Sequence, residues 1–213
     1  MREVYDQIAA SWYNLRHWPR FREELEELAR RWQGGRLLNV GCAHGPDFLP
    51  FREGFDLWGM DFSPEMIRFA RKYSRKFDFA VDLAVADASY LPYADDTFDC
   101  AISVATYHHI KGERGRGKAL RELRRVLKPQ GEAFITVWNR MQPRFWLRPR
   151  EVMIPWRSRG ETIYRYYYLF SRPELKGLLS EAGFKIVGIF PERSYRFPIK
   201  TFSRNICVLV KKE

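Results

Sequence analysis

The chain has 213 residues and a mass of 25.4 kDa, enough for one domain with a full core, residues 1–213. It is 46% hydrophobic and 16% aromatic, which argues against disorder. No apolar run approaches the roughly 18 residues of a membrane span, and the N-terminus lacks the apolar core of a signal peptide. Its 3 cysteines include no CxxC pair. We therefore expect a cytoplasmic protein with no disulfide framework, no metal and no membrane partner.

The formal net charge of +11 is unevenly distributed. Residues 1–110 hold 13 Lys/Arg and 17 Asp/Glu, whereas residues 111–172 hold 16 and 5. A basic excess confined to one segment favours contact with nucleic acid. Arginine outnumbers lysine 27 to 10, and guanidinium forks suit phosphate, although thermophilic habit explains an arginine-rich chain equally well.

The first 35 residues predict a helical cap. A short amphipathic helix is expected over residues 4–13, and a stronger one over residues 19–32, whose apolar side chains share one stripe: Phe21, Leu25, Leu28 and Trp32. Gly34 and Gly35 end the second helix.

Residues 37–61 predict a buried strand, a glycine turn, a helix and a second strand that ends in an acid. Gly41 and Gly45 allow the backbone to approach a ligand closely. Asp61 follows Gly41 by twenty residues, the spacing at which a second strand delivers a carboxylate to a ribose diol. This part of the chain therefore predicts a nucleotide site.

Further elements follow in order. Short strands are expected over residues 83–88 and 98–103, and Ser63 with Pro64 predicts a helix start. We expect a mobile basic turn over residues 112–117, then a helix to Leu127 and a strand over 133–138. A capped helix over 171–182 and strands near 185–190 and 205–210 complete the chain.

Residues 139–170 break this pattern, and we expect an irregular basic aromatic insertion. Arginines alternate with rings there, which suits phosphates and stacked bases. A solvated loop over an aromatic core patch is the alternative. Its cations and rings include Arg140, Arg144, Phe145, Trp146, Arg148, Arg150, Trp156, Arg157 and Arg159, followed by Tyr164 to Tyr168.

Five motifs in this order resemble those of the class I S-adenosylmethionine-dependent methyltransferases: "VGCAHG", "GMDFS", "ADASYLP", "FDCAIS" and "LRRVLKPQGEAFITVW". The resemblance implies an α/β, Rossmann-like fold: a seven-stranded, mostly parallel sheet whose last strand is antiparallel, with helices on both faces. NAD enzymes usually show a third glycine one turn into the helix, which this chain lacks. Asn39 and Ala43 depart from the family, which usually has an acid and a glycine there.

The implied cofactor is S-adenosyl-L-methionine. Asp61 is expected at its ribose, Asp87 at its adenine amino edge, and Gly41 and Gly45 at its methionine half. Arg16 is expected near its carboxylate, under a closing Tyr13. The full set of cofactor-binding residues also includes Asn39, Cys42, Ala43, Phe62, Ala88 and Val104.

Segments outside these motifs resemble the wobble-uridine tRNA carboxyl methyltransferases. They are "VYDQIAASWYNLRHWPR", "SVATYHHI", "VMIPW", "YRYYYLFSRPELKGLLSEAGF" and "SRNICVLVKK". The resemblance implies tRNA as substrate and a small zinc-binding activator subunit, for which the apolar edge segment 79–85 is the expected contact. Members often carry Trp after the Asn in the last segment, whereas Ile206 follows Asn205 here.

The chain lacks the Asn/Asp-Pro-Pro-Tyr/Phe motif used for exocyclic amino groups, so a carboxylate acceptor is expected. Arg165 or Arg204 is expected to clamp it, because a bidentate fork orients both oxygens. His108 is favoured over His109 as the pocket histidine. The expected catalytic set is Tyr107, His108, Arg165, Tyr166, Arg204 and Asn205. Two alternatives remain open: a methyltransferase for a quinone or another small carboxylic acid, and a non-catalytic RNA-binding protein.

Overall fold

The computed structural model describes residues 2–158 and 160–213, so Met1 and Arg159 lie outside the described residues. Seven strands form one sheet in the order β3-β2-β1-β4-β5-β9-β8. Strand β9 alone runs antiparallel to the other six, which confirms the expected fold class. The strands are β1 Gly35–Val40, β2 Phe55–Asp61, β3 Asp82–Val85, β4 Phe98–Val104, β5 Leu127–Trp138, β8 Phe184–Pro191 and β9 Asn205–Lys212.

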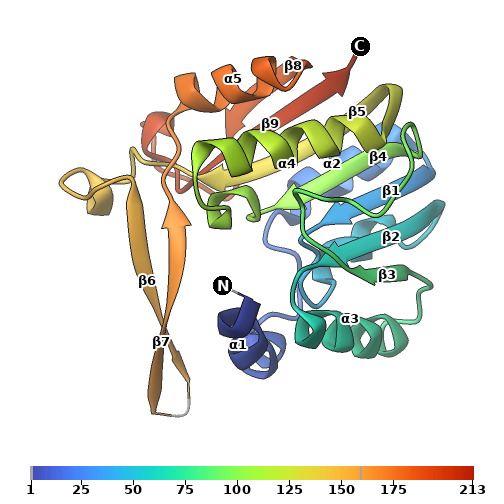
Figure 1. Cartoon of the computed structure of the whole chain (residues 1–213), viewed down its shortest axis with the longest axis horizontal. Coiled ribbons are helices and arrows are strands. Elements are labelled where there is room, and N and C mark those ends of the chain that lie inside the picture. The colour runs from blue at the N-terminus through green and yellow to red at the C-terminus, as the bar shows by residue number, and fades with distance from the viewer. Residues whose placement is uncertain (1, 159) are drawn as a thin grey trace.

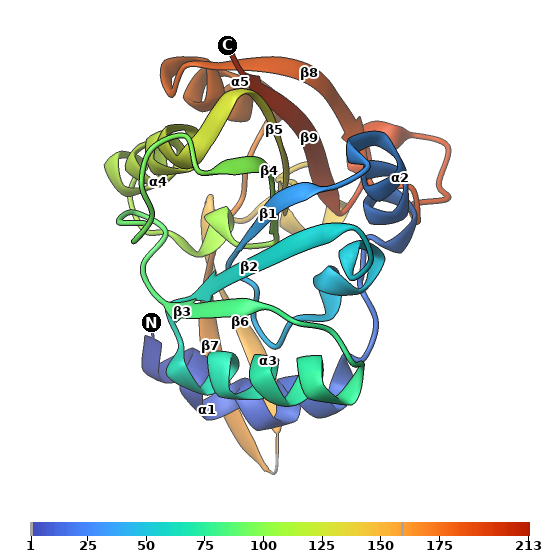
Figure 2. The ribbon, with the colours of Figure 1, turned by 90° about the vertical axis from the view of Figure 1, so that its right-hand side faces the viewer.

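Helices cover both faces of this sheet (Figures 1 and 2). Apolar residues of α4 and α5 pack on one face, and those of α2, α3 and the 3-10 helix η1 pack on the other. The helices are α1 Arg2–Leu15, α2 Arg22–Trp32, α3 Pro64–Lys76, α4 Glu113–Val126 and α5 Arg172–Glu181, with 3-10 helices η1 Pro46–Phe51, η2 Tyr107–His109, η3 Pro143–Phe145 and η4 Lys200–Phe202. None of the helices within 2–158 and 160–213 is long and apolar enough to cross a membrane.

Side-chain caps begin α3 and α5 where the sequence predicts them. The Ser63 hydroxyl accepts the N–H of Met66, with Pro64 in the first turn. Ser171 and Glu174 form a reciprocal capping box at α5. These caps fix where each helix leaves the sheet.

The helix expected after Gly45 is a 3-10 helix, η1, in which Pro50 has no N–H with which to continue an α-helix. One local expectation is wrong. The expected mobile turn over 112–117 is already the first turns of α4, which begins at Glu113. Burial of Leu120 and Leu123 outweighs the low helix propensity of the glycines there.

The expected irregular insertion contains a β-hairpin instead, β6 Glu151–Ser158 and β7 Glu161–Tyr168. It forms a separate two-stranded sheet that projects from the body alongside α1 (Figure 1). Trp156 stacks on Trp12 of α1 at 5.0 Å between ring centroids, and its Nε1–H donates to the Ser11 hydroxyl at 2.9 Å. An isolated hairpin is marginal in water, so this contact stabilises it.

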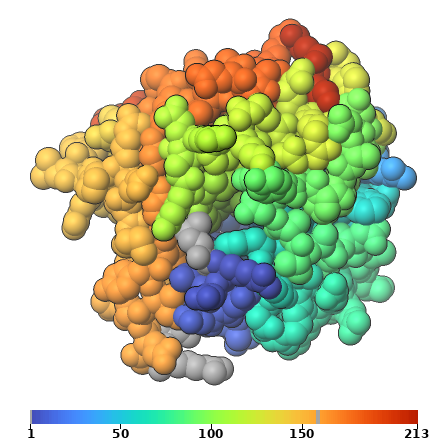
Figure 3. Space-filling view, viewed as in Figure 1, coloured from blue at the N-terminus to red at the C-terminus, as the bar shows by residue number. Residues whose placement is uncertain are grey.

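Helix α1 links the hairpin to the main sheet. Its buried residues Tyr5, Ile8 and Tyr13 share one core cluster with Phe69 of α3 and with Trp156. In the space-filling view α1, in dark blue, lies between the orange hairpin and the cyan-green α3 (Figure 3). The hairpin and α1 together therefore enclose one side of the space at the carboxyl ends of the central strands.

Candidate active site

The strand order reverses between β1 and β4, because β2 and β3 extend to one side of β1 and β4 and β5 to the other. Ligands of open α/β sheets bind at such a switch point, at the carboxyl ends of the strands. A cavity of about 570 Å³ lies there. Its lining comes from the strand ends, α1, η2 and the hairpin.

The floor of the cavity is a tight turn held against β2. The carbonyl of Met60 accepts the N–H groups of Gly41, at 2.8 Å, and Cys42, at 2.9 Å. Gly41 has a φ of +74°, and a Cβ there would lie 2.2 Å from the Thr106 Oγ1. Glycine is therefore required where the backbone turns into the cavity.

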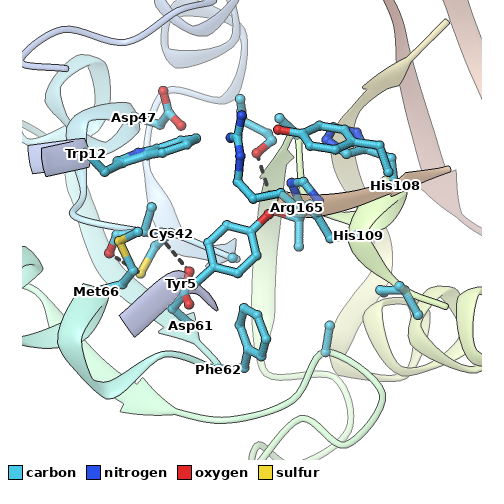
Figure 4. Close-up of a pocket in the computed structure, with 18 of the residues that line it drawn as sticks. Tyr5, Trp12, Cys42, Asp47, Asp61, Phe62, Met66, His108, His109 and Arg165 are labelled. Atoms are coloured by element: carbon cyan, nitrogen blue, oxygen red, sulfur yellow. Dashed lines mark hydrogen bonds between the residues drawn. The ribbon is translucent and has the colours of Figure 1, made fainter. Parts of the chain in front are cut away.

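Asp61, the last residue of β2, presents a buried carboxylate to the cavity (Figure 4). Its oxygens accept the N–H groups of Ala43 and Ser63, each at 2.9 Å. Burial raises the pKa of Asp61 to about 6, and these backbone hydrogen bonds oppose the shift. Burial also raises the pKa of Asp47 to about 6, and the charge of Arg16 opposes this shift.

Helix α1 and Arg16, the residue that follows it, form the wall of the cavity beside these carboxylates. The Arg16 guanidinium carbon lies 4.1 Å from the centroid of the Trp12 ring, a cation–π contact. Burial lowers the pKa of Arg16. In Figure 4 the Tyr5 ring lies between Asp61 and Phe62 on one side and Arg165 and His109 on the other. The cavity thus places two carboxylates and a cation beside a closely approaching backbone, which suits a nucleoside with a zwitterionic tail.

Arg165 of β7 enters the opposite side of the cavity and is only 6% exposed. Its guanidinium carbon lies 4.9 Å from the ring centroid of Trp156, 5.5 Å from that of Trp12 and 5.3 Å from that of Tyr167. No carboxylate within the described ranges 2–158 and 160–213 forms an ion pair with it, and its Nε has no hydrogen-bond partner there. A buried cation without an anion is costly, so this side of the cavity favours an anionic ligand.

Many of the residues predicted from sequence meet in this cavity. The cofactor candidates that line it are Arg16, Gly41, Cys42, Ala43, Asp61, Phe62, Asp87, Ala88 and Val104. The acceptor candidates that line it are His108 and Arg165, and His109 lies beside them. The residues that meet there are up to 149 positions apart in sequence, from Arg16 to Arg165.

Three other cofactor candidates do not line the cavity. Tyr13 stacks on Phe69 at 5.0 Å, within the contact between α1 and α3. Asn39 is fully buried in β1, and neither its amide nitrogen nor its amide oxygen has a partner among the described residues. Gly45 lies at the N-cap of η1 with a φ of +93°.

Four acceptor candidates are also separated from it. The Tyr107 hydroxyl donates to the carbonyl of Ala119 in α4, at 3.4 Å. Tyr166 follows Arg165 directly on β7, and successive side chains of a strand point to opposite faces. Arg204 and Asn205 both donate to the buried carboxylate of Glu192. Local partners thus occupy these polar groups or direct them into the core.

Sequence reasoning missed several lining residues, including Tyr5, Trp12, Asp47, Thr106, Trp138 and Tyr167. Two signals could have found some of them. Tyr5 and Trp12 lie seven residues apart on α1, about two helical turns, and Tyr167 lies two residues beyond Arg165, on the same face of β7.

Comparison with known proteins agrees with this geometry. Residues 38–135 match a family model described as a methyltransferase domain. A methyltransferase of Encephalitozoon cuniculi is 30% identical over 192 residues, which cover 86% of this chain and 85% of that protein. A tRNA (carboxymethyluridine(34)-5-O)-methyltransferase of Arabidopsis thaliana is 36% identical over 140 residues, 65% of this chain. The chain spans only 32% of that protein's length, and about a third to two fifths of related ones.

The solved structure of the CcbJ methyltransferase from Streptomyces caelestis superposes with a TM-score of 0.81 at 16% identity, covering 98% of this chain and 97% of that one. Fold and site together define a class I methyltransferase. The chain belongs to the methyltransferase family, and the cofactor that its motifs predict is S-adenosylmethionine.

Cofactor affinity should fall as the solution is acidified. Asp61 accepts hydroxyl hydrogens best as a carboxylate, so protonation below its pKa of about 6 competes with binding. We expect affinity to be full near pH 7.5 and to fall by up to about tenfold per pH unit below 6. Asp61→Asn should weaken binding by about 1.5–3 kcal/mol at pH 7.5 and remove most of the pH dependence. Titration calorimetry from pH 5 to 8 measures both.

Asp47→Asn is the matched control, because Asp47 lines the same cavity and also has a pKa of about 6. It should keep the pH dependence. Wild-type affinity in Asp61→Asn, or a pH dependence lost only in Asp47→Asn, would contradict the assignment of the ribose to Asp61.

Proposed function

We propose that the protein transfers a methyl group from S-adenosylmethionine to the carboxylate of a carboxymethyluridine at the wobble position of tRNA. The observation that carries this proposal is Arg165, a buried cation that forms no ion pair within residues 2–158 and 160–213, in the same cavity as Asp61. The Arabidopsis relative, whose name states this reaction, supports the same substrate.

Residues on the floor of the cavity would bind the cofactor. Asp61 holds the ribose hydroxyls, Asp87 lies at the adenine amino edge, and the turn from Gly41 to Ala43 lies along the methionine half. Arg16 pairs with the cofactor's carboxylate. When bound, the cofactor supplies an electrophilic methyl group on a sulfonium sulfur.

The acceptor needs orientation rather than deprotonation. A carboxyl group is already ionised at neutral pH, so no general base is required. Burial lowers the pKa of His109 to about 3 and that of His108 well below its usual range, so both rings are neutral. Their role is to hold the acceptor in line with the methyl group while α1 and the hairpin exclude water.

A tRNA substrate also accounts for a group of cations beside the cavity. Burial lowers the pKa of Arg144, and the positive charges of Arg20 and Arg204 lower it further. Arg204 is paired with Glu192, but no carboxylate of residues 2–158 and 160–213 forms an ion pair with Arg20 or Arg144. Phosphates would supply anions for these two cations. A methyltransferase for small quinones or acids would have no use for such a cluster.

The chemical nature of the product can be tested directly. A methyl ester is cleaved by mild base, whereas methyl groups on base nitrogen, base carbon or ribose oxygen are stable to it. With radiolabelled cofactor and bulk tRNA, nearly all transferred label should therefore be released as volatile methanol by brief alkali. Label that stays on the tRNA would exclude a carboxylate acceptor even with tRNA as substrate.

RNA affinity should depend on the segment from η3 to the start of the hairpin. Arg148 is exposed, and Arg144 stacks over Trp138 at 4.9 Å. Arg150 is paired with Glu174, so it is left unchanged. Reversing Arg144 and Arg148 to Glu should weaken tRNA binding about tenfold to a hundredfold near 0.1 M salt, and flatten its salt dependence. Filter binding across a salt series measures this effect.

Arg30→Glu with Arg71→Glu is the control, since these exposed arginines on α2 and α3 give the same change in net charge. It should lose far less affinity, and both double variants should bind the cofactor normally. Equal losses in the two double variants would show that net charge alone drives binding.

The proposal includes a small zinc-binding activator subunit at the open edge of β3, as the resemblance implies. Val85 on this edge strand is 48% exposed. Val85→Lys should prevent a small zinc-containing subunit from copurifying with the chain from its native cells, whereas Val187→Lys on the opposite edge strand, β8, should not. Full turnover by the purified chain alone would contradict the need for an activator.

A further inference from the structure

Three buried polar groups in the cavity have no hydrogen-bond partner among residues 2–158 and 160–213. They are the Tyr5 hydroxyl, the His108 Nε2 and the Arg165 Nε. Leaving such groups unpaired is costly, so a ligand that binds here has to satisfy them. They are linked by contacts: Tyr5 packs edge-on against His109, and Tyr167 contacts both histidines and Arg165.

The backbone fixes which nitrogen of His108 carries the proton. The N–H of Trp138 donates to the His108 Nδ1 at 3.2 Å, so Nδ1 is an acceptor. A neutral imidazole has one N–H, which therefore lies on Nε2. The ring stacks on Tyr167 at 4.9 Å with an interplanar angle of 18°, which holds this orientation. His108 thus presents a fixed donor to the cavity.

His109 has the opposite arrangement. Its Nδ1 lies 2.9 Å from the carbonyl of Tyr166, which can only accept, so Nδ1 carries the proton. His109 therefore adds no second N–H on Nε2. The two neighbouring histidines are set to different hydrogen-bonding roles by two backbone groups.

All three unpaired groups are donors, or in the case of Tyr5 can donate. A ligand group with acceptor atoms only, such as a carboxylate, satisfies them. The carboxamide of the same shape would direct an NH₂ at an N–H and leave both unpaired. We propose that His108, together with Tyr5, determines specificity for a carboxylate over the isosteric carboxamide at the Arg165 site. This inference rests on the proposed function.

The test is competition between two anticodon stem-loop RNAs that differ only at the wobble base. One carries 5-carboxymethyluridine and is the methyl acceptor; the other carries 5-carbamoylmethyluridine and is the inhibitor. Because the phosphate contacts are identical, their affinity ratio reports the acid site alone. The wild-type protein should prefer the acid by about tenfold to a hundredfold.

His108→Gln should reduce this preference to below about threefold, because a glutamine amide can present either its NH₂ or its carbonyl. Tyr5→Phe should raise the KM for the acid RNA, while its kcat falls less. Tyr164→Phe, an exposed tyrosine on the outer face of the hairpin, is the control and should match the wild type. Circular dichroism checks that each variant is folded. If His108→Gln does not fold, Tyr5→Phe still tests the site.

The outcomes separate the two claims. If the wild-type protein binds the carboxamide RNA as tightly as the acid RNA, the inference is overturned and the proposed function stays intact. Full discrimination retained by folded His108→Gln removes His108 from the specificity site. Absence of methyl transfer to the carboxymethyluridine RNA overturns both.

Discussion

The docking of the β6–β7 hairpin on α1 is the contact on which the acceptor side of the site depends. The stacked pair Trp12 and Trp156, with the hydrogen bond to Ser11, joins segments 145 residues apart. Because side chains alternate along β7, docking of this face also directs Arg165 and Tyr167 toward the strand ends. Without it, the sheet would keep its cofactor floor but lose the cationic wall that faces it.

Burial shifts the pKa values of the charged groups in the cavity. Asp47 and Asp61 lie in a desolvated region that raises their pKa values, and Arg16 beside them has its pKa lowered by the same cause. Such groups are poorly solvated in the free protein, and partners of opposite charge or with matching hydrogen bonds relieve that cost. A positively charged cofactor and an anionic acceptor would supply such partners on the two sides, which accounts for the placement of Arg165 opposite the carboxylates.

Strand and motif order could be predicted from the sequence because those signals are local. The spacing of Gly41 and Asp61 predicts that they meet at one edge of a parallel sheet, and both line the cavity. The hairpin was missed because its strands carry arginines and a proline within an aromatic run. Arg204 and Asn205 were expected at the site, but both donate to Glu192 instead. This partner follows the end of a different strand, and no local pattern in the sequence predicts the contact. Choosing between Arg165 and Tyr166 required the register of β7, which no local pattern fixes.

If Arg165 holds the carboxylate of the acceptor, as proposed, Arg165→Gln should impair single-turnover methyl transfer. Methyl transfer to tRNA should fall at least about a hundredfold, the loss expected when a donor to the reacting anion is removed. The affinity for S-adenosylhomocysteine, measured by calorimetry on the same preparation, should stay within about threefold of the wild type. Undiminished transfer, or a loss of cofactor affinity as large as the loss of transfer, would show that Arg165 does not hold the acceptor.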